Sequence, residues 1–406
     1  MKFDKEEYEN LIDILEEIPD PRHSRGVRYP FSHLLLMCIY AVLAGHSEAV
    51  EIAYYVELNF DYFHSLLKLN KVPSHDTFSR VLRFTNFEEL SISLGVWLKE
   101  NFPDIYERYE EKKVLHIDGK AVRGAGEKSK GEKPIYHLNA MYEGGAIGVE
   151  IKRVGEKENE ISCLPDYLKQ FELSETIVTM DAMGCNQTVI GEICKRGGNY
   201  VLPVKENQKR LWNVIQEEIE KLEKEKTWKE LDCIETMKKE HGRIEKVRFR
   251  MLSDTGFVYE KLGLESFYGT IARVGVMDKT TEMLKEGKET KAKNRSIFIT
   301  DMENITVEMR IALKQKSKIF QKIRAAHWNI EMQHWMLDIH LKEDRQTARK
   351  DNAVTNGSIL RRFCMMLNKQ DKELSGKPLK RFLMANEHDP NRIEKFLFKN
   401  VAQKEA

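Results

Sequence analysis

The sequence lacks a long apolar run. Its longest apolar stretch, from Leu34 to Gly45, is about a dozen residues long, whereas a helix that crosses a membrane needs roughly 20 residues. The stretch therefore predicts a buried helix. The first residues, MKFDKEEYEN, are acidic and amphipathic, unlike the basic start and apolar core of a signal peptide.

Cysteines are few, and no two of them form a Cys-x-x-Cys pair. The six present are scattered along the chain: Cys38, Cys163, Cys185, Cys194, Cys233 and Cys364. A disulfide framework or a thiolate zinc site needs closely spaced or paired cysteines. The spacing argues against both kinds of site and is typical of a protein of the reducing cytoplasm.

Net charge is also nearly absent, because 66 Lys and Arg against 65 Asp and Glu leave +1. This balance excludes a uniformly basic DNA-coating protein but is compatible with a basic groove offset by acidic surfaces. Hydrophobic residues at 41% and charged residues at 32% indicate a globular chain. A length of 406 residues suggests roughly two or three domains.

The first hundred residues predict helices. Apolar residues recur at helical spacing from Leu11 to Ile18, where Pro19 ends the pattern. A helix from Ser47 to Leu58 is expected to face the core through Val50, Ala53, Tyr54 and Leu58. Another helix is expected after Pro73, with Ser74 or Asp76 as its N-cap and Phe78, Val81 and Leu82 on its apolar face.

From Lys113 onward the pattern predicts a mixed α/β sheet. Val114–Asp118 reads as a buried strand that ends at an acid before a turn at Gly119. Ile135–Tyr142 and Ala146–Val154 flank Glu143-Gly144-Gly145 and predict a hairpin. The further expected elements are a helix at Glu160–Phe171, a strand at Thr176–Asp181, a helix at Thr188–Arg196, a strand at Tyr200–Val204 and a helix at Gln208–Glu223.

Residues 228–300 alternate between apolar and polar side chains and predict a β-rich insertion. Its residues Lys285–Asn294 are expected to form a solvated loop. A long helix over about Val307–Leu341 is expected to follow, and the charged residues after Gln370 predict a peripheral tail.

Two of the predicted strands end in an acid. Asp118 and Asp181 are 63 residues apart (181 − 118). Acids at strand ends of an α/β sheet lie at an edge where ligands bind, and burying them is costly unless they are paired or bind a cation. The pair therefore suggests a metal site. The alternative is that both carboxylates cap the turns that follow them.

Glu331 lies in a predicted helix with two Trp and two His nearby. One alternative is an amphipathic helix that leaves Glu331 merely exposed and buries Trp328, Trp335 and Ile339. Another is a transition-metal site on one helical face, formed by His327, Glu331 and His334, although the order differs from His-Glu-x-x-His.

Three sequence blocks occur in order: Ile117–Gly124 (IDGKAVRG), Met180–Gln187 (MDAMGCNQ) and His327–Glu331 (HWNIE). They are accompanied by Pro19–Arg22, Pro73–Arg80, Leu202–Gln208, His241–Glu245 and Leu337–Asp344. Together, over roughly residues 10–368, the blocks resemble the bacterial insertion-sequence transposases of the H-repeat-associated (Rhs-linked) family, within the DDE superfamily.

The resemblance implies an α/β fold, with a ribonuclease-H-like catalytic core that carries a β-rich insertion and follows an all-helical N-terminal domain. The implied domains are a helical DNA-binding or associated domain over 1–105, a DDE catalytic domain over 106–370 with its insertion at about 228–300, and a charged tail over 371–406. The acids that match the catalytic triad are Asp118, Asp181 and Glu331. Where the broader superfamily often has Tyr, Arg and Lys around the Glu, this sequence has Arg324, His327 and Asp338.

The chemistry implied by the resemblance is phosphodiester cleavage at terminal inverted repeats, followed by joining of the freed 3′-OH ends to target DNA. The three carboxylates would bind two divalent cations, Mg²⁺ or Mn²⁺ as a substitute, about 3.5–4 Å apart. Carboxylate oxygens suit these ions, and the scattered histidines do not indicate zinc.

Double-stranded DNA is the expected partner, bound by a dimer or higher multimer in the cytoplasm, at the nucleoid, without a membrane. The side chains expected to contact phosphates or flank the site are Lys120, Arg123, Lys205, Arg243, Arg324 and His327. Two other functions are compatible with the same core: a metal-dependent nuclease that does not rejoin DNA, and a catalytically silent, domesticated DNA-binding protein. The second has no need to keep repulsive carboxylates where phosphates bind.

Overall fold

The computed structural model describes residues 9–25, 27–102, 113–126, 134–142, 147–155, 158–229, 231, 233–240, 243–263, 266–285, 288–302, 330–371 and 376–398. The chain forms two compact units. The helical unit consists of Met1–Glu111, Gly119–Lys157 and Trp328–Ala406, and the sheet unit of Lys112–Asp118 and Glu158–His327. The boundary falls inside strand β1 (Lys113–Val122), which contributes residues to both units.

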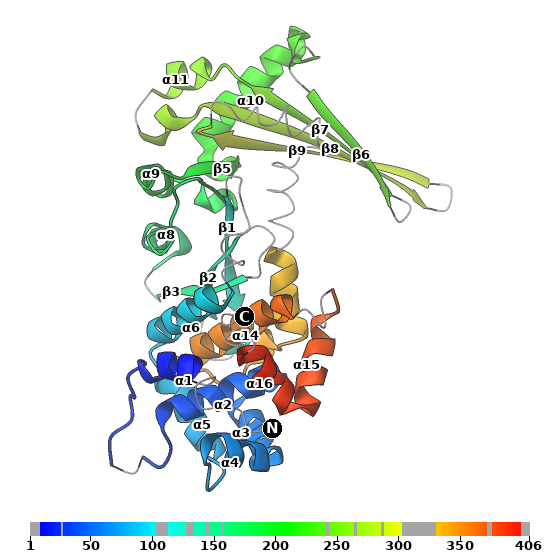
Figure 1. Ribbon diagram of the computed structural model, residues 1–406. Coiled ribbons are helices and arrows are strands. Elements are labelled where there is room, and N and C mark those ends of the chain that lie inside the picture. The colour runs from blue at the N-terminus through cyan, green and yellow to red at the C-terminus, as the bar shows by residue number, and fades with distance from the viewer. Residues whose placement is uncertain are drawn as a thin grey trace, which may run out of the picture. The chain divides into compact units, whose positions relative to one another are not determined.

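Two helices, α2 (Phe31–Leu43) and α14 (Ala353–Gln370), form the centre of the helical unit and are buried along almost their whole lengths. The helices that accompany them in Figure 1 are α1 (Glu9–Glu16), α3 (Ala49–Leu58), α4 (Phe60–Leu67), α5 (His75–Phe84), α6 (Phe87–Asn101), α15 (Leu379–His388) and α16 (Pro390–Phe398). The hairpin of β2 (Ile135–Tyr142) and β3 (Ile147–Val154) completes the unit. The predicted buried helix at Leu34–Gly45 is thus confirmed.

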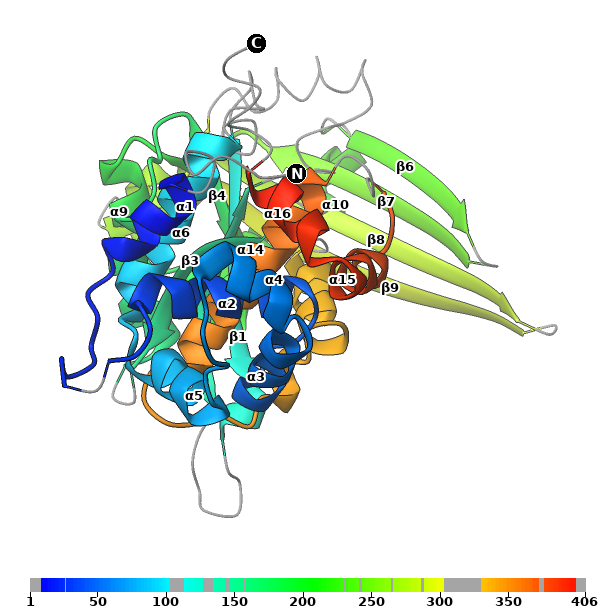
Figure 2. The same ribbon diagram turned by 60° about the horizontal axis from the view of Figure 1, so that its bottom comes forward.

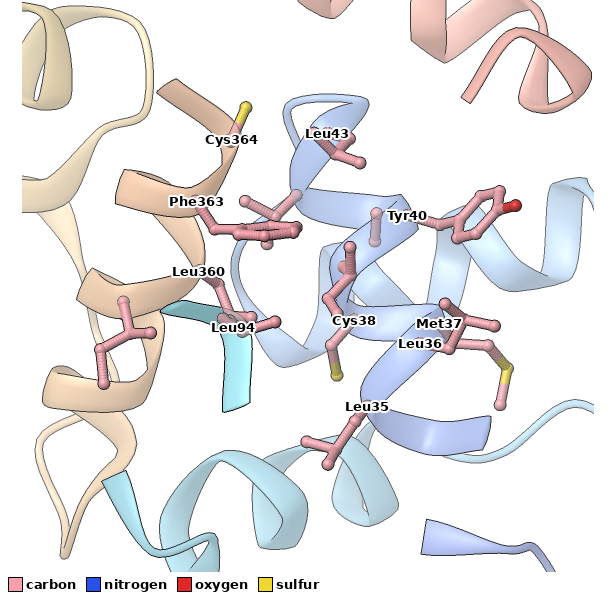
Figure 3. Packing of buried hydrophobic residues seen from close by; sticks show 14 of the residues in the cluster. Leu35, Leu36, Met37, Cys38, Tyr40, Leu43, Leu94, Leu360, Phe363 and Cys364 are labelled. Carbon is pink, nitrogen blue, oxygen red and sulfur yellow. The ribbon is translucent and has the colours of Figure 1, made fainter. Parts of the chain in front are cut away.

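Apolar side chains from three segments far apart in the sequence fill the core of the helical unit. Figure 3 shows Leu35 and Cys38 of α2, Leu94 of α6, and Leu360 and Phe363 of α14 packed into one cluster. Burying apolar surface contributes about 25 cal/mol per Å². This cluster therefore supplies the main force that holds the N-terminal and C-terminal helices in one unit.

Helix α3 differs from its prediction. Its buried residues are Ile52, Tyr55 and Val56, whereas Val50, Tyr54 and Leu58 are exposed. The prediction chose the wrong face because apolar residues lie on both sides of this short helix, so that periodicity alone did not distinguish them. The prediction for α5 is confirmed, with Ser74 as N-cap residue and Phe78, Val81 and Leu82 buried.

The prediction of a peripheral tail after Gln370 was wrong for residues 379–398. Helices α15 and α16 bury Leu379, Phe382, Ile393 and Leu397 in the core of the helical unit. The charged residues between these positions misled the prediction. Lys380 and Arg381 are exposed on the outer face of α15, whereas Glu394 of α16 is buried and accepts a hydrogen bond from Tyr62.

The sheet unit contains three parallel strands followed by four antiparallel ones. Strands β1, β4 (Thr176–Met180) and β5 (Asn199–Val204) are parallel neighbours. Strands β9 (Lys288–Thr300), β8 (Arg273–Lys285), β7 (Arg243–Leu252) and β6 (Cys233–Glu240) continue from β5 as an antiparallel ribbon. Among the described residues the strand order is β3-β2-β1-β4-β5-β9-β8-β7-β6. The fold is therefore mixed α/β with an N-terminal helical region, as expected.

Three helices of the sheet unit match the sequence pattern closely: α8 (Glu160–Leu168), α9 (Gln187–Lys195) and α10 (Lys209–Lys224). Helix α11 (Gly256–Leu262), inside the insertion, was not predicted. The β-rich insertion is also confirmed. Two details were wrong. Strand β1 does not end at Asp118 but continues to Val122, and Lys288–Asn294 belongs to strand β9 rather than to a loop.

Among the described residues, no helix is both long enough and apolar enough to cross a membrane.

The buried position of α15 predicts a large effect of a single core substitution. Phe382 is fully buried, and Phe382→Ala should lower the free energy of unfolding by about 3–5 kcal/mol, because a cavity replaces the ring. Met384→Ala on the exposed side of the same helix should change it by less than about 0.5 kcal/mol. Urea unfolding measures both; equal effects would show that α15 does not dock as described.

Candidate active site

The two strand acids of the sheet unit lie in the same register. Strands β1 and β4 pair in parallel, and the last paired residues are Ile117 and Met180. Asp118 and Asp181 directly follow these two residues, so the register that joins the strands also aligns the acids. Parallel neighbours point paired side chains to the same face, at a strand separation of about 4.8 Å. The parallel register therefore brings Asp118 and Asp181 to equivalent positions, one residue after the pairing of β1 and β4 ends.

A buried polar pair lies behind these acids. His116 and Thr179 are register partners two residues before Asp118 and Asp181, so they share the same face of the sheet. The Nδ1 atom of His116 lies 2.6 Å from the Oγ1 atom of Thr179, and both residues are buried. Because this hydrogen bond joins the two strands, it holds their register immediately before the acids.

The turn after Asp181 is held by short-range contacts. Oδ1 of Asp181 accepts a hydrogen bond from the backbone N–H of Met183 at 3.0 Å. Asn207 donates to the carbonyl of Ala182 at 2.7 Å, and Gln208 donates to the carbonyl of Cys185 at 2.6 Å. The capping interpretation of Asp181 is therefore correct for one of its oxygens. A carboxylate has about four lone-pair sites, so this cap does not use its whole capacity to bind a ligand.

Two half-buried carboxylates in register fit a hard divalent cation such as Mg²⁺, which is bound by one or two carboxylates together with water and phosphate oxygens. Without a cation, the two negative charges repel each other. Within the described ranges, no group of three or more His, Cys, Asp or Glu residues is arranged to hold a metal ion. The described part of the sheet unit thus offers two candidate ligands for a cation, Asp118 and Asp181.

The third predicted acid, Glu331, belongs to the helical unit. It is exposed on a helix over residues 330–339, whose inner face is formed by Ile330, Gln333 and Leu337. Trp335 and Ile339 are 50% and 54% exposed, so the interpretation in which these two residues form the core face was wrong. His327 lies outside the described residues. The transition-metal alternative, which needs His327, therefore stays a prediction.

Lys120 connects strand β1 to the Glu331 helix. Its Nζ atom lies 2.8 Å from Oδ1 of Asp338 on that helix, and 3.5 Å from both Glu343 and Asp344. The Lys120 side chain is only 6% exposed. A buried ammonium group is costly unless acids compensate it. The Lys120–Asp338 pair therefore holds the helix against the part of β1 that lies in the helical unit, and Glu343 and Asp344 add negative charge from the turn that follows the helix.

The innermost member of this network is Glu343, which is fully buried and pairs with the fully buried Arg362 at 2.6 Å. Arg362 also donates to Oδ1 of Asn139 on β2 at 2.9 Å. Burial alone would raise the pKa of Glu343, but the charges of Arg362, Lys120 and Arg361 together hold it well below its usual value. Glu343 is therefore ionised, and it neutralises cations from β1 and α14.

A second buried arginine extends the network. Arg361 donates to the carbonyl of Leu341 at 2.9 Å, to Gln346 at 2.6 Å and to Ser47 at 2.9 Å.

On β2, His137 lies 3.1 Å from Thr355 of α14, and burial, together with the nearby Arg362, lowers the pKa of His137 to about 3. His137 is therefore neutral.

The sequence interpretation assigned no role to this network. The available signal was the pair Arg361-Arg362 inside the apolar run ILRRFCMML of α14, because charges in such a run need buried partners. Their partners could not be identified from the sequence, since Asn139, Ser47 and Glu343 lie in three distant segments.

Glycines allow close packing beside the acids. A Cβ atom on Gly119 would lie 2.2 Å from the Tyr136 hydroxyl on β2, and one on Gly124 would lie 2.5 Å from the carbonyl oxygen of Asp344. Cβ atoms do not approach other atoms this closely. A side chain at Gly119 would therefore displace the Tyr136 ring of β2, and one at Gly124 would clash with the backbone of the segment that carries Glu343.

The predicted phosphate contacts divide into three groups. Arg123 is 84% exposed, although its side chain lies 3.8 Å from Asp344, and Lys205 is exposed directly after β5. Lys120 and Arg243 are ion-paired, Lys120 in the buried network and Arg243 with Glu245 at 3.7 Å. The remaining two, Arg324 and His327, lie outside the described residues.

Comparison with known proteins gives two family matches. Residues 109–368 match the transposase DDE domain, and residues 12–98 match the domain described as DDE_Tnp_1-associated. The chain is 28% identical to the "H repeat-associated putative transposase YhhI" of Escherichia coli K12, over 90% of this chain and 92% of that protein. It is 26% identical to the "Putative transposase YncI" of Escherichia coli O157:H7, over 91% of this chain and 89% of that protein.

The charge network predicts a strong effect of Glu343→Gln. The substitution leaves the buried Arg362 and Lys120 without their shared counter-charge, so the free energy of unfolding should fall by about 3–5 kcal/mol. Glu387→Gln, at a half-exposed pair with His46, is the matched control and should cost less than about 1 kcal/mol.

The decrease in the free energy of unfolding caused by Glu343→Gln should also depend on pH. A glutamate whose pKa is depressed in the folded protein stabilises it above the unfolded pKa of about 4.3, and this contribution falls at lower pH. The difference between the wild type and Glu343→Gln should therefore shrink by about 2 kcal/mol between pH 5 and pH 3. Urea unfolding at several pH values measures it; a constant difference would contradict an ionised Glu343.

Proposed function

The chain belongs to the transposases with a DDE domain, and from this premise we propose that it cuts DNA at terminal inverted repeats and joins the freed 3′-OH ends to target DNA. The family expected from the sequence blocks is confirmed by the match over residues 109–368. The observation that carries the proposal is the shared register of Asp118 and Asp181 at the point where two parallel strands separate.

We assign the core to the ribonuclease-H-like class. An antiparallel β2–β3 hairpin, the parallel strands β1, β4 and β5, and helices α8 and α9 between the strands support this assignment. The proposed domains are the helical DNA-binding domain over 1–105, the catalytic domain over 106–370 and the C-terminal residues 371–406. The two family matches, over 12–98 and 109–368, support the first boundary.

The proposed catalytic acids are Asp118, Asp181 and Glu331. The register aligns the first two, while one oxygen of Asp181 is fixed by the N–H of Met183. The Lys120–Asp338 ion pair supports the third, because it ties β1, two residues after Asp118, to the helix that carries Glu331. Asp338 follows Glu331 by seven residues, or about two helical turns. In this proposal Lys120 is a positioning residue.

The same three carboxylates are proposed to hold Mg²⁺, or Mn²⁺ in its place. When bound, such ions lower the pKa of an attacking water and stabilise the leaving 3′ oxygen. The protein's own contribution is to align the carboxylates. The His116–Thr179 hydrogen bond and the capped turn after Asp181 hold the aspartates.

Double-stranded DNA is the proposed partner, both at the inverted repeats and at the target, and a dimer or higher multimer acting at the nucleoid is proposed to bind it. Arg123 and Lys205 are the exposed cations proposed to contact phosphates, together with Arg243. Lys120 is assigned to the buried network instead, because its ammonium group already lies among three carboxylates.

The deciding experiment is a cleavage and strand-transfer assay. Purified protein is incubated with Mg²⁺ or Mn²⁺, a labelled duplex that carries the terminal repeat of the element, and a target plasmid. Asp118→Asn, Asp181→Asn and Glu331→Gln should each lower cleavage by at least about 10³-fold, because each removes a proposed metal ligand. Affinity for the duplex should change by less than about threefold, since the fold and the basic side chains are unchanged.

Asp166→Asn is the matched control, because this aspartate is exposed and pairs with the exposed Lys169 at the C-terminal end of α8. It should cleave at the wild-type rate. Cleavage without joined products would indicate a nuclease on the same core, and repeat-specific binding without cleavage in either metal would indicate a silent DNA-binding protein. Full activity of Asp181→Asn would exclude the proposed acids.

The proposed roles of Lys120 and Arg123 can be separated. Lys120→Met removes a buried ion-pair partner and should lower the free energy of unfolding by roughly 3 kcal/mol. Arg123→Ala should leave stability within about 0.5 kcal/mol but reduce the slope of log affinity against log salt by about 1. Thermal unfolding and DNA titrations at several KCl concentrations measure both effects. If Lys120→Met changed the salt slope but not the stability, Lys120 would be a DNA contact instead of a buried ion-pair partner.

A further inference from the structure

The antiparallel ribbon of β6, β7, β8 and β9 has two faces that carry different side chains. Figures 1 and 2 show the four strands running side by side, and in Figure 1 their outer ends extend beyond α10 and α11. The register assigns each residue to a face, because residues paired across antiparallel strands point to the same side. Phe249, Met251 and Phe298 lie on the first face and pack in the core of the sheet unit.

The inner part of the second face is covered and charge-paired. The guanidinium groups of Arg250 and Arg295 lie over the Trp228 ring, and Arg295 pairs with Asp278 at 2.6 Å and with Glu223 of α10 at 2.8 Å. In the same row, Arg248 pairs with Glu235 at 2.8 Å. Each arginine of this part therefore has an acidic partner.

Further out on the second face, the lysines form no ion pair in the part of the chain that the structure describes, although the charge of Lys246 acts on Glu235 in the neighbouring row. Lys246 of β7 and Lys293 of β9 both pair in register with Thr280 of β8, which places them in one row. Lys239 lies in the next row on this face, because its partner Ile244 precedes Lys246 by two residues. In the part of the chain that the structure describes, none of these three lysines forms an ion pair. Glu282 is the acid that shares their rows.

The first face of the same outer strands behaves differently. There, Glu245 lies 2.9 Å from Lys279 and 3.7 Å from Arg243, so its cations are partly neutralised. The two faces therefore differ in ion pairing: Lys279 and Arg243 of the first face share Glu245, whereas the three lysines of the second face form no ion pair among the described residues. We name Lys239, Lys246 and Lys293 the lysine face.

Protection against aggregation explains part of this pattern, because lysines on edge strands prevent pairing with other chains. Lys239 lies on the edge strand β6, and Lys293 lies on a part of β9 that pairs only with β8. Lys246 does not fit this explanation, since β7 is paired on both sides over its whole outer length. A lysine there has no edge to protect.

We propose that the lysine face binds the phosphate backbone of duplex DNA; this inference rests on the proposed function and adds to it a contact surface in the insertion. Lys246 and Lys293 are separated by two strand spacings, or about 10 Å, so they can reach different phosphates. Contacts of this type are independent of sequence and orient the duplex without reading its bases. The surface is distinct from Arg243, which lies on the opposite face.

The test compares two triple variants of the full chain. Lys239→Gln/Lys246→Gln/Lys293→Gln removes the lysine face. Lys238→Gln/Lys261→Gln/Lys279→Gln removes the same charge from positions outside it, and two of these lysines, Lys261 and Lys279, are bound to acids. Affinity for a fluorescent duplex of random sequence is measured by anisotropy from 50 to 300 mM KCl, and thermal unfolding confirms that both variants are folded.

The lysine-face variant should bind about 10- to 100-fold more weakly at 150 mM KCl, and its salt slope should be shallower by about 2 to 3, since each lost phosphate contact removes about 0.9. The control should stay within about threefold of the wild type. Equal effects in both variants, or no effect in either while the wild type binds, would overturn the inference and leave the proposed function intact. A wild type that neither binds nor cleaves duplex DNA would overturn both.

Discussion

The buried ion pair between Glu343 and Arg362 is the interaction on which the helical unit depends. Both side chains are fully buried, so each would be strongly destabilising without the other. The Glu343 carboxylate also pairs with Lys120 of strand β1, and the Arg362 guanidinium donates a hydrogen bond to Asn139 of strand β2. A purely apolar core could be as stable, but it would not specify which strand position meets which helix position. Hydrogen-bonded charges do, because their geometry is directional.

This network also relates the unit's stability to its proposed chemistry. Lys120 follows Asp118 by two residues, and Asp338 shares a helix with Glu331. The ion pair between them is therefore a local constraint on the helix that carries the third proposed acid. Arg361 extends the constraint to the loop before α3 through Ser47. Packing of the apolar clusters brings the segments together, and the charges fix their alignment.

In the sheet unit, parallel pairing has the corresponding role. The separation of 63 residues between Asp118 and Asp181 has no meaning in an unfolded chain. It becomes an alignment because β1 and β4 pair with that same offset, from Lys113 with Thr176 to Ile117 with Met180. The His116–Thr179 hydrogen bond lies in the same register and favours it over a shift by one residue, which would turn one acid to the other face.

Local patterns in the sequence determined the elements and the two strand acids. A β-branched run predicted β4, the short run Tyr200–Val204 predicted β5, the apolar run predicted α2, and the sequence blocks identified the family, because each of these signals lies within a few neighbouring residues. The face of α3, the continuation of β1 past Asp118 and the burial of α15 were decided by tertiary packing, which selects among several locally acceptable arrangements. The partners of Lys120 and Arg362, and the division of the ribbon's lysines between two faces, were likewise decided only in three dimensions. Each depends on pairing between distant segments, and no local pattern encodes which distant residue becomes the neighbour.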